Sequence, residues 1–227
     1  MAKQYGDAVT AAALDEAITQ FIQNKFVLAI LGKAKTGKST LLNALLARRD
    51  DLVAPIDRLP ASSAITRFYW NEAEAAAVHF RNGKAQHIPF KNIRDYVTEE
   101  SNPENRKEVN IVEVGGPFPG MDHDLVLVDT PGAGSIHEYH DQILQEFIPQ
   151  ADAVLYLVTA RMPMDQDELD LLTKVKAADI SKIFFAINKV DATSETDLED
   201  AEKHNLHVLG EAGVTVGEMH RISAKRA

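Results

Sequence analysis

The residues with the clearest chemistry form segment 32–39, which reads GKAKTGKS. The segment matches the phosphate-binding pattern GxxxxGK[ST] at every position, between a predicted strand and a predicted helix. Glycines let backbone N–H groups face a phosphate, and the helix start adds partial positive charge. We expect Lys38 to bridge the terminal phosphates of a nucleotide as a catalytic residue, and the Ser39 hydroxyl to bind Mg²⁺. The predicted phosphate-binding set is Gly32, Lys33, Ala34, Lys35, Thr36, Gly37, Lys38, Ser39 and Thr40.

A second motif, NKVD at 188–191, indicates which base the nucleotide carries. A carboxylate at Asp191 can accept hydrogen bonds from both N1–H and the 2-amino group of guanine, a pair of donors that adenine lacks. Such charge-assisted bonds contribute roughly 1.5–3 kcal/mol each, so the preference for guanine is strong. The segment SAK at 223–225 matches the last guanine-contacting loop. The predicted base-binding set is Asn188, Lys189, Asp191, Ser223, Ala224 and Lys225.

A third motif, DTPG at 129–132, follows the apolar run 125–128. The pattern DxxG is common by chance, but its position directly after a predicted strand is the one expected for a motif that contacts Mg²⁺ and phosphate. We expect Asp129 to hold Mg²⁺ through water and the Gly132 N–H to meet the γ-phosphate.

Four continuous apolar runs must position these motifs, at 26–31, 125–128, 153–158 and 183–187. Continuous apolar runs are typical of strands buried on both faces, and each is followed by a stretch with helical character. Capping-box spacings at Asp165/Glu168 and Ser194/Asp197 mark two helix starts. The sequence therefore predicts an α/β fold: a doubly wound, mostly parallel sheet flanked by helices.

The segment from 60 to 120 differs from this pattern. The runs 65–70 and 76–80 are predicted to be the two strands of an antiparallel hairpin, and the polar segment 101–109 a loop. At the other end, apolar residues at helical spacing predict an amphipathic helix over 11–26.

Composition limits the classes of partner. The chain has 227 residues, 24 basic and 34 acidic side chains and no cysteine. This acidic balance disfavours a nucleic-acid partner, and the absence of cysteine excludes a disulfide framework and suits the cytoplasm. No apolar run approaches the length of a membrane span.

Five strings resemble the large GTPases of the dynamin superfamily, and among them the bacterial dynamin-like proteins: GKAKTGKSTLLNALL, LPASSAITRF, DTPGAGSIHEYH, FFAINKVD and ISAK. The resemblance covers nearly the whole chain from about Leu14. A spacing of 97 residues between Gly32 and Asp129 agrees with this branch. The resemblance implies a P-loop G domain over 26–227, truncated after the last guanine-binding loop. It also implies that helix 1–25 joins a helical bundle whose remainder is absent.

The resemblance implies a switch hydroxyl shortly after Pro60 that binds Mg²⁺ and orients the attacking water. The chain offers Ser62, Ser63 and Thr66, and we favour Ser62 as a catalytic and metal-binding residue. Ala133 stands where small GTPases carry a water-orienting glutamine. In the family a polar phosphate-loop residue contributes to catalysis, helped by a monovalent cation or a dimer partner. The matching residue is Lys35, whose ammonium could replace that cation. The alternative is a Lys35 that points to solvent.

The resulting hypothesis is Mg²⁺-dependent hydrolysis of GTP to GDP and phosphate by a dynamin-like GTPase. The resemblance implies a homodimer through the nucleotide face, membrane contact through segments outside this chain, and a cytoplasmic location with peripheral membrane association. A regulatory GTPase switch of the ribosome-assembly type is the alternative, and it predicts an RNA-binding appendage. An ATP-dependent kinase fits poorly with the NKVD motif.

Overall fold

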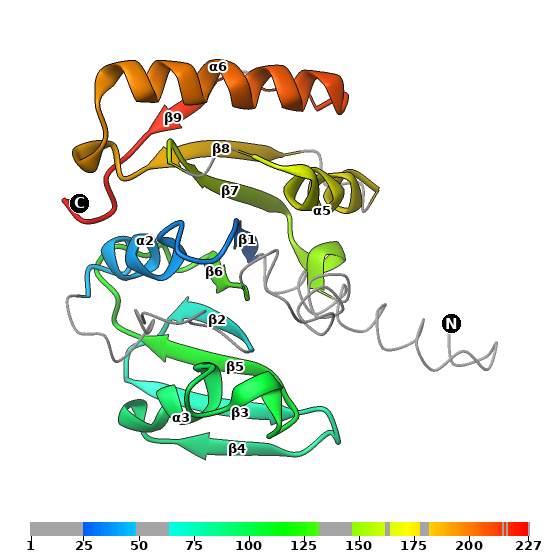
Figure 1. The fold of residues 1–227 in the computed structure, drawn as a ribbon. Helices are drawn as coiled ribbons and strands as arrows, with labels where there is room; N and C mark the ends of the chain where they lie inside the picture. The colour runs from blue at the N-terminus through cyan, green and yellow to red at the C-terminus, as the bar shows by residue number, and fades with distance from the viewer. Residues whose placement is uncertain are drawn as a thin grey trace.

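The computed structural model describes residues 25–48, 64–131, 147–161, 164–177, 182–214, 216 and 218–226. Within these ranges one nine-stranded sheet has the order β4-β3-β5-β2-β6-β1-β7-β8-β9, and Figure 1 shows it from β9 at the top to β4 at the bottom. The strands are β1 (Phe26–Leu31), β2 (Ile65–Trp70), β3 (Ala75–Phe80), β4 (Ala85–Ile88), β5 (Val109–Gly116), β6 (Leu125–Asp129), β7 (Ala153–Thr159), β8 (Ile183–Asn188) and β9 (Met219–Arg221).

The parallel part of the sheet confirms the prediction. The strand β1 pairs in parallel with β6 and β7, and β8 pairs in parallel with β7 and β9. All four apolar runs predicted to be buried strands belong to this group. Because these strands point the same way, their carboxyl ends share one edge of the sheet, where ligands of open α/β folds bind.

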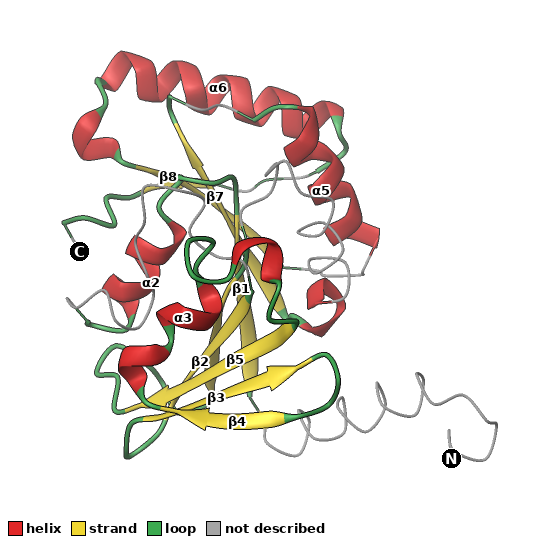
Figure 2. Ribbon diagram, turned by 60° about the horizontal axis from the view of Figure 1, so that its bottom comes forward, coloured by secondary structure: helices red, strands yellow, loops and turns green. Residues whose placement is uncertain are grey.

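Helices cover both faces of the sheet (Figure 2). In the described part of the chain they are α2 (Lys38–Leu45), α3 (Arg94–Val97), α5 (Gln166–Ala177) and α6 (Glu195–Glu211). Short 3₁₀ turns add η2 (Phe90–Asn92), η3 (Pro103–Asn105), η4 (Ile148–Gln150) and η5 (Val190–Ala192). No helix of the described residues is long and apolar enough to cross a membrane.

Two buried clusters lie on opposite faces of the sheet. Ile30 packs in one cluster with Leu42 of α2, whereas its neighbour Ala29 packs in the other with Leu172 of α5 and Leu198 of α6. Alternate residues of β1 therefore enter different clusters. This burial on both faces confirms the doubly wound architecture.

Both predicted helix starts are confirmed, with a reciprocal capping box at Asp165 and a capped Asp197 N–H at Ser194. The Asp165 N–H donates to Glu168 Oε2 at 3.3 Å, and the Glu168 N–H donates to Asp165 Oδ1 at 3.4 Å. The Asp197 N–H donates to Ser194 Oγ at 3.2 Å, and the Ser194 hydroxyl donates to Asp197 Oδ2 at 2.7 Å. These bonds satisfy N–H groups that a helix start leaves unpaired, and they fix where α5 and α6 begin.

The predicted pairing of 65–70 with 76–80 is wrong. Both segments form strands, but β5 lies between them, parallel to β2 and antiparallel to β3. Val112 and Val114 of β5 are fully buried, and a position between two strands buries them better than an edge would. The hairpin of this region is β3–β4. The segment predicted to be a loop contains η3, and Val109 begins β5.

Several predicted features lie outside the described residues. They are the N-terminal helix up to residue 24, the serines Ser62 and Ser63, and the pair Gly132 and Ala133.

Candidate functional site

The segment between β1 and α2 forms a loop that needs glycine at two positions. Gly32 has a φ of +140° and Gly37 a φ of +101°, in the region that side chains disfavour. A Cβ at Gly32 would lie 2.3 Å from the Leu157 carbonyl oxygen. A Cβ at Gly37 would lie 2.4 Å from Asn188 Nδ2. The glycines therefore allow the loop to contact β7 and the end of β8.

Lys38 is a buried cation at the start of α2. Its side chain Nζ donates to the carbonyl oxygens of Gly32 at 2.9 Å and of Lys33 at 3.0 Å. Desolvation lowers the pKa of Lys38 from 10.5 to about 8, although Asp129 and Glu168 act in the opposite direction. Most of the ammonium is still charged at pH 7, so the loop encloses a positive charge suited to a phosphate.

A hydroxyl and a carboxylate meet beside this lysine. The Ser39 hydroxyl donates to Asp129 Oδ2 at 3.3 Å, and Asp129 is 2% exposed at the end of β6. Mg²⁺ prefers hard oxygen ligands, usually one or two protein groups together with phosphate oxygens and waters. Ser39 and Asp129 therefore fit a magnesium site. Thr66, the third candidate for the switch hydroxyl, lies opposite Asp129 in the β2–β6 pair and is 3% exposed.

Asn188 joins the phosphate loop to the segment after β9. Its Nδ2 donates to the Thr36 carbonyl oxygen at 2.9 Å, and its Oδ1 accepts from the Ala224 N–H at 3.0 Å. Asn188 is 2% exposed, so this amide is an internal bridge. The next residue, Lys189, has a φ of +65° and donates from Nζ to the Lys35 carbonyl oxygen. Segments far apart in sequence thus form one site.

Asp191 also contacts the segment after β9. The Ser223 hydroxyl donates to Asp191 Oδ1 at 2.7 Å, and this bond is the main cause of a lowered pKa for the Asp191 carboxyl group. Like an ordinary aspartate, this carboxylate is ionised at neutral pH, so it acts only as an acceptor. That is the form needed to accept two N–H donors from one edge of a base.

The structure brings most of the predicted site residues together at the carboxyl edge of the parallel strands. Lys35 has a φ of +67° and an exposed side chain, and Lys225 is also exposed. Ala34 and Thr40 are half-buried in the loop and in the first turn of α2. Figure 1 shows the C-terminal residues ending beside α2, and Ala224 belongs to the same buried cluster as Leu41 of that helix.

Sequence reasoning missed two long-range contacts that support this edge. Lys33 forms an ion pair with Asp165, and its Nζ lies 3.8 Å from Glu168 Oε2. The capping-box spacing identified Asp165 and Glu168 only as a helix start. In addition, Arg161 donates from its guanidinium to the Ala192 carbonyl oxygen at 2.9 Å, next to the segment predicted to bind the base. No local pattern marked Arg161.

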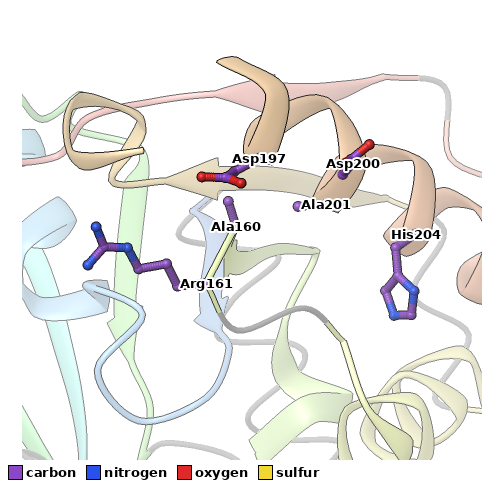
Figure 3. Close-up of a pocket in the computed structure, with 6 residues that line it drawn as sticks. All are labelled: Ala160, Arg161, Asp197, Asp200, Ala201 and His204. Atoms are coloured by element: carbon purple, nitrogen blue, oxygen red, sulfur yellow. The ribbon is translucent and has the colours of Figure 1, made fainter. Parts of the chain in front are cut away.

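A cavity of about 460 Å³ lies between the segment after β7 and the first turns of α6 (Figure 3). Its walls carry Arg161 opposite Asp197, Asp200 and His204, so its charge is mixed. None of its lining residues, as far as the chain is described, belongs to the phosphate loop. The candidate site is therefore defined by the loop and its contacts and not by this cavity.

The sheet, the phosphate loop and the two segments joined by Asn188 define a P-loop GTPase type of domain. The family model described as the Dynamin family matches residues 28–190, which is most of the chain. The chain therefore belongs to the dynamin family.

Among curated relatives, an uncharacterized protein from Caldicellulosiruptor sp. is 37% identical over 82% of this chain and 46% of its own length. Dynamin-like protein A of Bacillus subtilis is 24% identical over 94% of this chain and 23% of its own length. GTPase Der of Citrifermentans bemidjiense is 28% identical over 88% of this chain and 33% of its own length. The chain thus spans less than half the length of each of these relatives.

A solved structure agrees in fold. It was determined in work on an oligomerised bacterial dynamin pair in the sensing and tethering of membranes. It matches with a TM-score of 0.72 and 19% identity, over 96% of this chain and 36% of that one.

Proposed function

We propose that this chain binds GTP and, with Mg²⁺, hydrolyses it to GDP and phosphate. The observation that carries the proposal is the Asn188 bridge, because it fixes the phosphate loop and the base-binding segments in one arrangement. A nucleotide with its phosphates in the loop would then present its base to Asp191.

Guanine selectivity is assigned to Asp191. Its carboxylate would accept from N1–H and the 2-amino group of guanine, and the bond from the Ser223 hydroxyl fixes its position. Adenine would leave this carboxylate with an acceptor opposite it instead of a donor, which is a strong penalty in a site built around hydrogen bonds. Asn188, Lys189, Ala224 and Lys225 would complete the base pocket.

The phosphates are assigned to the loop. Lys38 would turn from the carbonyl oxygens of Gly32 and Lys33 to the terminal phosphates, and the Gly132 N–H would meet the γ-phosphate. Ser39 and Asp129 would hold Mg²⁺, with Ser62 as the switch ligand. When bound, Mg²⁺ supplies positive charge that offsets the charge on the phosphate oxygens.

Acceleration of hydrolysis is assigned to Lys35, since Ala133 has no side-chain group that could orient water. The Lys35 backbone is held in a left-handed conformation and its carbonyl oxygen accepts from Lys189, while its side chain is exposed at the rim of the loop. An ammonium at this rim could move toward the developing charge of the transition state.

The wider role follows from the family and is part of the proposal. In it, residues 26–227 form the G domain and residues 1–25 contribute a helix to a bundle. Nucleotide-dependent dimerisation would drive membrane remodelling by a cytoplasmic protein that contacts lipid through other segments. The related solved structure is described as an oligomerised pair in membrane tethering, which supports the proposed dimerisation and membrane role. The similarity to GTPase Der keeps a regulatory switch as the alternative.

Two measurements on the nucleotide-free chain test the proposal: calorimetry with GTP, GDP and ATP in Mg²⁺, and an assay of phosphate released from GTP. We expect tight GTP and GDP binding, ATP binding weaker by at least about a hundredfold, and release of phosphate from GTP that EDTA abolishes. Equal affinity for ATP and GTP would refute the assignment.

A further inference from the structure

Lys33 lies where the phosphate loop meets α5. Its Nζ donates to Asp165 Oδ2 and lies 3.8 Å from Glu168 Oε2. The side chain of Asp165 is 50% exposed, so its contact with Lys33 is open to water, whereas the side chains of Lys33 and Glu168 are 17% and 1% exposed, so their contact is largely shielded. Such an ion pair is screened much less than one on the surface.

Glu168 is held from several sides. The Tyr156 hydroxyl donates to its Oε1 at 3.3 Å, and the Asp165 N–H donates to its Oε2 at 3.3 Å. Burial raises the pKa of the Glu168 carboxyl group, while the charge of Lys33 acts in the opposite direction. A buried carboxylate needs both hydrogen bonds and a cation, and Lys33 supplies the cation from the phosphate loop.

The backbone of Lys33 is a second point of attachment. Its carbonyl oxygen accepts from Lys38 Nζ at 3.0 Å and from the Thr36 hydroxyl at 2.9 Å. The side chain of Lys33 thus ties residue 33 to α5, while its carbonyl oxygen ties Lys38 and Thr36 to residue 33. One residue connects the helix to the groups that would face the phosphates.

We propose that Lys33 is a positioning residue, whose ion pair with Asp165 and Glu168 holds the phosphate loop ready for the nucleotide before it binds. This inference rests on the proposed function. Because the pair acts on the free loop, its loss weakens GDP and GTP binding by a similar factor. Turnover at saturating GTP stays nearly unchanged, because the pair is present in the bound state and the transition state alike.

The variants must separate positioning from folding. Lys33→Met alone would leave a buried carboxylate without its cation, which destabilises proteins strongly. The main variant is therefore the double substitution Lys33→Met/Glu168→Gln, which removes the cation together with the buried carboxylate and keeps an acceptor for Tyr156, while the half-exposed Asp165 carboxylate stays. Lys33→Arg keeps the charge and is the rescue variant. Lys176→Met, at the other end of α5, is the control for loss of a lysine from this region.

The measurements are thermal melting, the Kd values for GDP and a non-hydrolysable GTP analogue, and kcat at saturating GTP. We expect a folded double variant with both affinities about tenfold weaker and kcat within about twofold of the parent. Lys33→Arg and Lys176→Met should bind as the parent does.

Three results would overturn the inference: parent-like affinities in the folded double variant, no rescue by Lys33→Arg, or a double variant that does not fold. The last counts because removing a buried carboxylate together with its cation is often neutral for stability, and the remaining Asp165 carboxylate is half exposed to water. A parent chain that binds no guanine nucleotide would instead refute the proposed function.

Discussion

Lys38 gives the nucleotide-free protein a measurable dependence of stability on pH. Desolvation lowers the pKa of its ammonium group from 10.5 to about 8. Since one pKa unit corresponds to about 1.4 kcal/mol, the charged form costs the folded state about 3 kcal/mol at neutral pH.

The direction of this pH dependence follows from the number of protons that each state binds. Well below pH 8, Lys38 is protonated in both the folded and the unfolded state, so it does not make the free energy of unfolding depend on pH. Between pH 8 and about 10.5 the folded protein loses this proton while the unfolded chain keeps it. The unfolded state then binds more protons, and the free energy of unfolding rises with pH.

Urea unfolding of the parent and of Lys38→Met at pH 7.0 and 9.5, without nucleotide and with EDTA, measures this effect. The difference in unfolding free energy, parent minus variant, should increase by about 2 kcal/mol over this interval. The cost of leaving the carbonyl oxygens of Gly32 and Lys33 without a donor is independent of pH and cancels. Lys35→Met, which removes an exposed lysine from the same loop, is the control. A difference that does not change with pH would contradict burial of the Lys38 charge.

Three further substitutions test separate parts of the site. Gly37→Ala places a Cβ 2.4 Å from Asn188 Nδ2 at a φ of +101°, so it should lower stability by about 1–3 kcal/mol and weaken GTP binding; parent-like melting and Kd values would contradict this. Lys35→Ala should lower the single-turnover rate about tenfold or more and leave the GTP Kd within about twofold, and an unchanged rate would remove Lys35 from catalysis. Ser39→Asn should weaken Mg²⁺-dependent GTP binding more than GDP binding in calorimetry, and equal losses would argue against a metal ligand.

The motif residues were predictable because their chemistry is local in sequence. The spacing within segment 32–39 already specifies a loop followed by a helix, and the structure confirms both. The apolar runs specified the parallel strands for a similar reason, since burial on both faces leaves a continuous apolar signal.

Strand pairing in segment 65–116 was not predictable in the same way. A strand's neighbour depends on contacts between distant residues. The strand β5 lies between β2 and β3, although it begins more than 30 positions after the start of β3. The alternating run that begins at Val109 was a usable sign of a strand, although not of its partners. The ion pair of Lys33 with Asp165 joins residues 132 positions apart, so no local spacing could reveal it.

The most direct test of the guanine-nucleotide assignment is a change of base specificity in Asp191→Asn. The asparagine amide can accept from N1–H of xanthine and donate to the 2-carbonyl group that replaces the 2-amino group of guanine. We predict that calorimetry in Mg²⁺ will show GTP binding weakened by about a hundredfold or more and xanthosine triphosphate bound more tightly than by the parent. Unchanged GTP affinity, or no gain for xanthosine triphosphate in a folded variant, would contradict the account.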